Sequence, residues 1–157
     1  MSYNFSADEI FEMAKQIERN GVIFYRNAAN SVEGAKEKSF LMSLSVMEEA
    51  HERIFEEMQK ELADQEKESQ VFDPMEESVL YLKALADTRI FFKKETPKNN
   101  MKEIFKSAID AEKDSIVFYV GMKEMVKGEL GKKRVDDIIK EEMSHIRLLS
   151  GKLLELK

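Results

Sequence analysis

Two short stretches decide how this chain folds: residues 48–51 read Glu-Glu-Ala-His and residues 142–145 read Glu-Met-Ser-His. In each stretch a glutamate precedes a histidine by three positions, and the sequence contains no other histidine. Residues three apart on an α-helix lie on the same face, about one turn from each other. Each stretch therefore predicts a helix that presents one carboxylate and one imidazole to a common point.

A constant offset of 94 residues relates these two stretches and also a third pair of glutamates. Glu18 lies 33 residues before His51, and Glu112 lies 33 residues before His145. Further identical pairs appear when residues 7–63 slide by 94 without a gap: Ile10/Ile104, Phe11/Phe105, Ala14/Ala108, Phe24/Phe118, Tyr25/Tyr119 and Gly34/Gly128. The chain is therefore an internal duplication of a helix pair.

Two lone glutamates and two Glu-x-x-His pairs form the ligand set of a carboxylate-bridged dinuclear metal site in a four-helix bundle. Four buried carboxylates without partners would destabilise a domain severely, and two divalent cations would cancel their charge. We expect Glu48 and Glu142 to bridge the metals, while Glu18 with His51 and Glu112 with His145 would each cap one metal. The predicted ligands are Glu18, Glu48, His51, Glu112, Glu142 and His145. Oxygen and nitrogen ligands with open positions suit iron or manganese, unlike a closed structural zinc site.

Helix boundaries follow from residues at matching places in the two halves. Ser6 and Asn100 each precede a glutamate by three positions, which is the pattern of a helix N-terminal cap. Gly34 and Gly128 stand where a left-handed residue would end the first helix of each pair. The short turns that follow predict antiparallel helix pairs. The predicted pairs span residues 6–63 and 100–157.

Residues 64–99 have no counterpart in the repeat. An up-and-down bundle needs only a few residues at this point, whereas a connection between parallel helices must run the length of the bundle. Asp73-Pro74 followed by apolar residues predicts a short extra helix over about 74–87. The predicted fold is all-α: one domain, residues 1–157, with a ferritin-like four-helix bundle and a long crossover between the second and third helices.

Composition excludes several classes of function. The net charge is −6 and no stretch collects the lysines and arginines, so nucleic acid and anionic membranes are poor partners. Without a signal peptide or a run of eighteen apolar residues, a cytoplasmic location is expected. The chain has no cysteine, which excludes disulfides, thiol catalysis and thiolate-held metal centres.

Tyr25 and Tyr119 lie seven residues, or two turns, beyond the lone glutamates of their halves. A phenol at this position can hydrogen-bond a ligand carboxylate and hold its orientation. The alternative is an ordinary buried tyrosine whose hydroxyl uses any nearby acceptor. Other acidic residues near the predicted ligands are expected on solvated faces or outside the site: Glu49, Glu52, Glu56, Glu57, Glu141, Asp110 and Asp114.

At the six predicted ligands and the two tyrosines, the chain resembles the rubrerythrin branch of the ferritin-like diiron proteins over essentially its full length. The resemblance implies two non-haem iron ions, with manganese or a mixed pair also possible, that react with hydrogen peroxide or dioxygen, commonly in a homodimer. Rubrerythrins place a further glutamate one turn after Glu112, where this chain has Ser115. They also usually carry a four-cysteine rubredoxin domain, so here an external electron-donor protein is expected.

Three functions remain open at this point. The first is an oxidoreductase that reduces peroxide or dioxygen at a diiron centre. The second is a protein that binds, buffers or senses iron without sustained turnover. The third is a metal-free helical scaffold, and the symmetric six-ligand set argues against it. Only turnover distinguishes the first two, because both need the same ligands.

Overall fold

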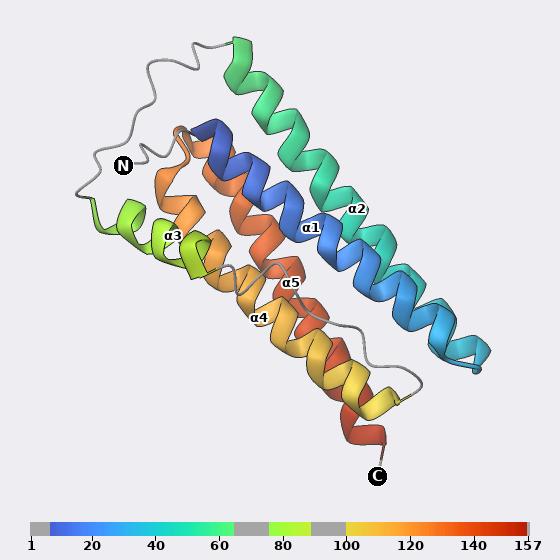
Figure 1. Ribbon diagram of the computed structural model, residues 1–157. Helices are drawn as coiled ribbons and strands as arrows, with labels where there is room; N and C mark the ends of the chain where they lie inside the picture. The colour runs from blue at the N-terminus through green and yellow to red at the C-terminus, as the bar shows by residue number, and fades with distance from the viewer. Residues whose placement is uncertain (1–6, 65–75, 89–99, 157) are drawn as a thin grey trace.

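The computed structural model describes residues 7–64, 76–88 and 100–156. This part of the chain contains α-helices and no β-strand, as the predicted fold class requires (Figure 1). The helices are α1 (Ala7–Ser31), α2 (Ala35–Asp64), α3 (Glu77–Thr88), α4 (Met101–Met125) and α5 (Glu129–Glu155). The four long helices are those predicted from the repeat, and α3 is the predicted extra helix.

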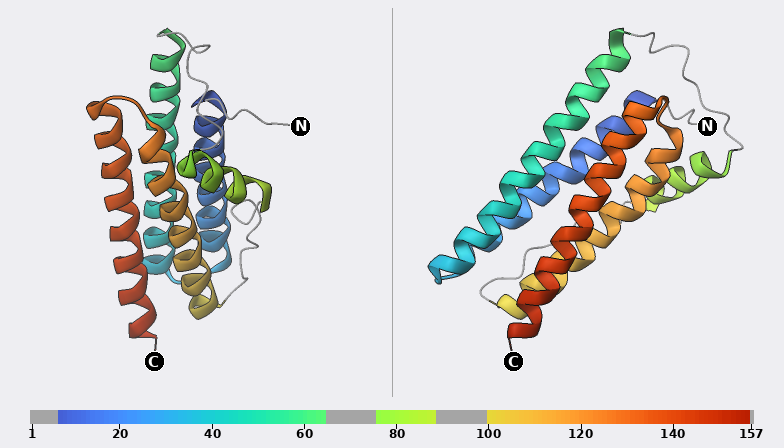
Figure 2. Two further views of the ribbon diagram at one scale, coloured as in Figure 1. Left: turned by 90° about the vertical axis from the view of Figure 1, so that its left-hand side faces the viewer. Right: turned by 180° about the vertical axis from the view of Figure 1, so that it is seen from behind.

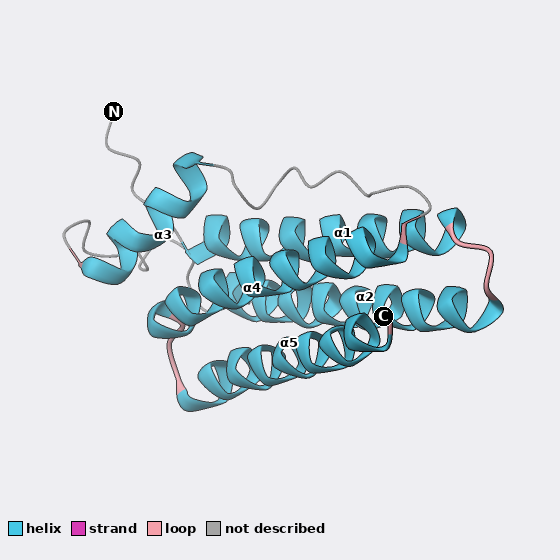
Figure 3. Cartoon of the chain, turned by 90° about the horizontal axis from the view of Figure 1, so that it is seen from below, coloured by secondary structure: helices cyan, strands magenta, loops and turns pink. Residues whose placement is uncertain are grey.

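The four long helices form a bundle in which neighbours run in opposite directions. Helix α1 packs beside α2 and α4, and α5 packs beside the same two helices. Helices α2 and α4 run in the same direction, and so do α1 and α5 (Figures 1 and 2). The chain must therefore cross the length of the bundle between α2 and α4, as the long connection predicted. Helix α3 packs against α4 at one end of the bundle (Figure 3).

Helix starts show one confirmed cap and one correction. The Asn100 side chain accepts a hydrogen bond from the Glu103 backbone N–H at 3.2 Å, which caps α4 as predicted. Gly128 has a φ of 86°, but Gly34 does not have a positive φ, so the left-handed prediction for Gly34 is wrong. The predicted Ser6 cap and the Asp73-Pro74 helix start lie outside the described residues.

Both glycines directly precede a helix as well as following one. The Gly34 carbonyl accepts a hydrogen bond from the Lys38 N–H at 3.0 Å, and the Gly128 carbonyl accepts one from the Lys132 N–H at 3.1 Å. These are first-turn bonds of α2 and α5. These bonds form at both glycines although only Gly128 has a positive φ, so the start of the second helix does not require a left-handed residue at this place.

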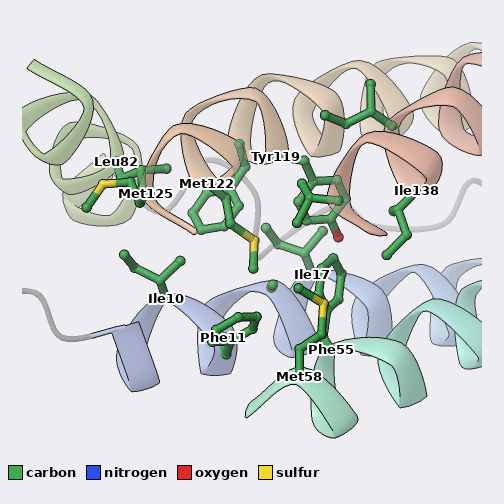
Figure 4. Packing of buried hydrophobic residues seen from close by; sticks show 14 of the residues in the cluster. Ile10, Phe11, Ile17, Phe55, Met58, Leu82, Tyr119, Met122, Met125 and Ile138 are labelled. Carbon is green, nitrogen blue, oxygen red and sulfur yellow. The ribbon is translucent and has the colours of Figure 1, made fainter. Parts of the chain in front are cut away.

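Two apolar clusters fill the bundle, one on either side of its middle. The cluster near α3 includes Phe11, Phe55, Met122 and Ile138, whose side chains point toward one another, with Leu82 of α3 at its edge (Figure 4). The other cluster consists of Phe24, Tyr25, Ala28, Ala29, Val32, Leu41, Leu44, Ile104, Phe105, Ala108 and Leu149. Every long helix contributes residues to both clusters. Along each helix, the predicted metal ligands lie between the residues of one cluster and those of the other.

No helix in the described part of the chain combines the length and the hydrophobicity that a membrane span requires.

Candidate metal centre

All six predicted ligands lie in the interior, between the two apolar clusters, and none is more than 3% exposed. Helix α1 contributes Glu18 and α4 contributes Glu112. Helices α2 and α5 each contribute one Glu-x-x-His pair. The six side chains are Glu18, Glu48, His51, Glu112, Glu142 and His145. The repeat in the sequence thus becomes a single polar volume surrounded by apolar packing.

The ligand atoms form two overlapping groups, and in each group they lie within 4.8 Å of one another. One group consists of Glu18, Glu48, His51 and Glu142, and the other of Glu48, Glu112, Glu142 and His145. Glu48 and Glu142 belong to both. Two adjacent cations could fit this arrangement, sharing two carboxylates and having one further carboxylate and one imidazole each.

Both imidazoles direct Nδ1 into the cluster. The His51 Nδ1 lies 2.9 Å from Glu142 Oε1 and 3.5 Å from Glu18 Oε2. The His145 Nδ1 lies 3.3 Å from Glu48 Oε1. The two rings are stacked, with centroids 6.0 Å apart and an interplanar angle of 21°. Each half of the chain therefore directs one imidazole nitrogen into the cluster at an equivalent place.

The ligand atoms lack the hydrogen bonds that buried polar atoms normally have. In the described part of the chain, the buried side-chain atoms without a hydrogen-bond partner include Glu18 Oε2, Glu48 Oε1, Glu112 Oε2, both oxygens of Glu142, and Nδ1 of His51 and His145. Each such atom costs about 1–3 kcal/mol when nothing satisfies it. Cations at the two positions would satisfy all seven, so the donor set fits a pair of divalent metals.

Without metal, protons reduce the repulsion among the carboxylates. Burial, followed by the Glu48 carboxylate, raises the pKa of Glu18 well above its usual range. Burial and the carboxylates of Glu48 and Glu112 do the same to the pKa of Glu142. Both groups therefore hold a proton far more readily than an exposed glutamate does.

The pKa of Glu112 shifts in the opposite direction. Burial alone would raise it, but the close approach of Glu142 and His145 and the hydrogen bond from Tyr25 together outweigh burial and lower it. The pKa of His145 would fall on burial, yet the Glu112 and Glu48 carboxylates raise it to about 10. The raised pKa of His145 and the lowered pKa of Glu112 favour an ion pair between the two side chains in the metal-free site, and a metal ligated by His145 would have to displace its proton.

The two tyrosines hydrogen-bond ligand carboxylates across the bundle. Tyr119 on α4 donates its hydroxyl proton to Glu18 Oε1 on α1 at 2.5 Å, and Tyr25 on α1 donates to Glu112 Oε1 on α4 at the same distance. Each tyrosine thus reaches the glutamate of the other half. Burial raises the pKa of both phenols well above the usual value, so both remain protonated donors.

The comparisons with known proteins agree with this geometry. The profile of the rubrerythrin family matches residues 9–153. This chain belongs to the rubrerythrin family. A crystal structure from Thermotoga maritima, proposed to be that of a ferritin-like diiron-carboxylate protein, superposes with a TM-score of 0.70 at 24% sequence identity and covers 100% of both chains. It shows that the fold is ferritin-like. No curated protein sequence gives a significant match.

The outer nitrogens of the two histidines have different neighbours, which the sequence analysis missed. The Glu141 carboxylate hydrogen-bonds His51 Nε2, although we predicted a solvated side chain, and about half of that side chain is indeed exposed. The matching atom of His145 instead meets the sulfur of Met47 at 3.3 Å. Met47 and Glu141 are themselves 94 residues apart, so the repeat would have revealed the pair if the outward neighbours had been compared.

The other acidic residues near the ligands do not join this rubrerythrin-family site. Glu49 and Glu52 form ion pairs with Arg26 and Arg19 on the outer face of α1 and α2. Glu56 and Glu57, which we also predicted to be solvated, are exposed, and so is Asp110, which we predicted to lie outside the site. Asp114 lines a small pocket beside the cluster without belonging to either ligand group.

That pocket, of about 40 Å³, lies between α1 and α4 and reaches Glu48 and Glu112. Gly21 and Ser115, which are 94 residues apart, both line it. A Cβ at Gly21 would lie 2.9 Å from Glu48 Oε2, so glycine leaves room for that carboxylate. Ser115, at the position of the further rubrerythrin glutamate, is small and donates to the Ala111 carbonyl at 3.0 Å. The pocket has room for a few molecules the size of water.

Proposed function

We propose that the buried cluster binds two iron ions and that the loaded protein reduces hydrogen peroxide or dioxygen with electrons from an external donor. The observation that carries this proposal is the pair of overlapping ligand groups that share Glu48 and Glu142. Seven buried atoms without partners converge in these groups. A metal-free scaffold gives no reason for so many unsatisfied polar atoms in the middle of an apolar bundle.

Each proposed metal position has its own terminal ligands. Glu18 and His51 would hold one ion, and Glu112 and His145 would hold the other. The carboxylates of Glu48 and Glu142 would bind both ions. Four carboxylates and two divalent ions cancel in charge, which makes burial of the whole site tolerable. Bound in the ferrous state, such a pair supplies the two electrons that, with two protons, convert one hydrogen peroxide into two water molecules.

The protein residues around the site would orient the ligands and restrict access. Tyr119 and Tyr25 fix the carboxylates of Glu18 and Glu112 by one hydrogen bond each. The apolar clusters on both sides exclude bulk water from the ligands. The pocket between α1 and α4 is too small for an organic substrate of ordinary size, which favours a small oxidant.

The second candidate function is iron binding, buffering or sensing without sustained turnover. Two features support it: Ser115 at the position of a rubrerythrin glutamate, and the lack of any cysteine that could hold a rubredoxin-type iron centre. An oxidoreductase built on this chain needs a separate electron-donor protein. Manganese or a mixed pair in place of iron, and the homodimer that the resemblance implies, are part of the same proposal.

Anaerobic loading with Fe(II), followed by mixing with peroxide in a stopped-flow spectrometer, tests the proposal. We expect two iron ions per chain, oxidation of the diferrous protein within the measurement, and repeated cycles only when an electron donor is added. Iron that binds but stays ferrous under excess peroxide would favour the binding function. A chain that binds no iron would exclude both functions.

A further inference from the structure

The two proposed metal positions have matching ligands, but different residues contact the outer nitrogens of their histidines. Glu141 of α5 accepts the outer N–H of His51, which lies on α2. Met47 of α2 occupies the equivalent place behind His145 on α5, with its sulfur 3.3 Å from Nε2. Residues 47 and 141 are related by the same offset that relates the ligands. The duplication therefore contains a carboxylate on one side and a thioether on the other.

These two acceptors differ strongly in what they do for an imidazole. A carboxylate accepts a charge-assisted hydrogen bond, which fixes the tautomer with the lone pair on Nδ1, holds the ring plane, and strengthens the imidazole as a metal ligand. A thioether sulfur is a weak acceptor and a flexible group. His51 is thus held ready to coordinate, while His145 relies on packing and on its carboxylate neighbours inside the site.

We propose that Glu141 makes the two metal positions unequal, so that the position formed by Glu18 and His51 fills first and holds its ion more tightly than the position formed by Glu112 and His145. The inference rests on the proposed metal centre. Glu141 is a positioning residue, because it acts through His51 and touches no metal. Loss of a carboxylate behind a ligating histidine typically costs 10–100-fold in metal affinity. The two binding steps should differ by a factor of this order.

The repeat supplies a reciprocal pair of variants. Glu141→Gln keeps the shape but removes the carboxylate behind His51, and should weaken the tighter step by about 10–100-fold. Met47→Glu places a carboxylate behind His145 and should strengthen the weaker step, bringing the two affinities together. Matched controls are Glu56→Gln and Met143→Glu, which make the same changes at exposed positions on α2 and α5.

Anaerobic calorimetric titration of the metal-free protein with Fe(II), repeated with Co(II) so that absorption reports the coordination of each ion, resolves the steps. His51→Ala should abolish the tighter step and His145→Ala the weaker one. Equal steps in the wild type, or Glu141→Gln and Met47→Glu variants that behave like their controls, would overturn the inference while leaving the metal centre intact. A wild type that binds no metal would overturn the proposed function and this inference together.

Discussion

The helix pairs α1–α2 and α4–α5 place the same three ligand types in the buried cluster, but the residues one layer further out differ. Each pair contributes one lone glutamate and one Glu-x-x-His, and each donates one tyrosine hydroxyl to the other pair. Glu141 contacts the outer nitrogen of His51, whereas Met47, at the equivalent place in the repeat, contacts that of His145. In the lining of the pocket, Gly21 in the first half corresponds to Ser115 in the second. The comparison indicates that the six central side chains are symmetric, whereas the positions around them differ and would make the two proposed metal positions unequal.

The largest effect on metal content is expected when one of the two shared carboxylates is removed. Glu48→Ala or Glu142→Ala removes a carboxylate that belongs to both ligand groups, so iron content should fall at both positions. His51→Ala or His145→Ala removes a ligand from one group and should leave close to one ion per chain. Metal-to-protein ratios of the four purified variants, loaded identically, measure this. Equal ratios in all four would contradict the shared role of the two glutamates.

Metal removal should lower stability by a few kcal/mol. A ligand present at 100 times its dissociation constant stabilises the folded state by about 2.7 kcal/mol, and two ions act together. Without them, the seven unpartnered atoms depend on protons alone. Melting curves with and without chelator at neutral pH provide the measurement. If the two curves coincide, the cluster does not bind metal.

The stability of the metal-free protein should depend on pH in a definite direction. The raised pKa values of Glu18 and Glu142 mean that the folded metal-free protein keeps protons that the unfolded chain releases, so its stability falls as pH rises above 4.5. The protonated form of His145 contributes fully below pH 6.5, and that contribution is lost as pH rises toward about 10. The lowered pKa of Glu112 acts oppositely, but only as pH falls below 4.5.

Metal binding needs those protons removed, so it strengthens as pH rises while the metal-free protein weakens. The difference in melting temperature between loaded and metal-free protein should therefore be larger at pH 8 than at pH 6. Differential scanning calorimetry at both values checks the sign. If the difference in melting temperature becomes smaller toward pH 8, the pKa shifts of Glu18, Glu142 and His145 described above are wrong.

A smaller effect is expected at the matched pair Gly21 and Ser115. Gly21→Ala adds a helix-favouring residue worth about 0.5–1 kcal/mol, and the metal-free protein tolerates it because the flexible Glu48 side chain can move. In the loaded protein Glu48 is held by metal, so affinity should fall. Ser115→Ala is the matched control and should change neither quantity appreciably. Melting temperature and iron affinity, measured together, should move in opposite directions for Gly21→Ala only.

Effects of a similar small size should come from the tyrosines. Tyr119→Phe removes one hydrogen bond from Glu18, and Tyr25→Phe removes one from Glu112, each worth about 1 kcal/mol or about fivefold in affinity. Because each tyrosine serves the other half, Tyr119→Phe should weaken the position that contains His51. Titration of the two variants should show opposite steps affected. A change in the same step for both would mean that the tyrosines act on the cluster as a whole.

Much of this molecule could be predicted from its sequence because the decisive signals are local or periodic. A three-residue spacing on one helix fixes a shared face, and the offset of 94 identifies all six ligands without any knowledge of how the helices pack. The length of residues 64–99 specified a crossover, since only that length allows α2 and α4 to run in the same direction.

Only the tertiary structure decided which side chains of different helices contact one another. Which glutamate each tyrosine reaches, and the placing of Glu141 rather than solvent behind His51, depend on the axial register between α1 and α4 and between α2 and α5. A shift of one turn, about 5.4 Å, would exchange these partners without altering the pattern of apolar residues along any helix. Sequence periodicity determines which face of a helix turns inward, whereas the packing of the two apolar clusters fixes how far along its neighbour each helix lies.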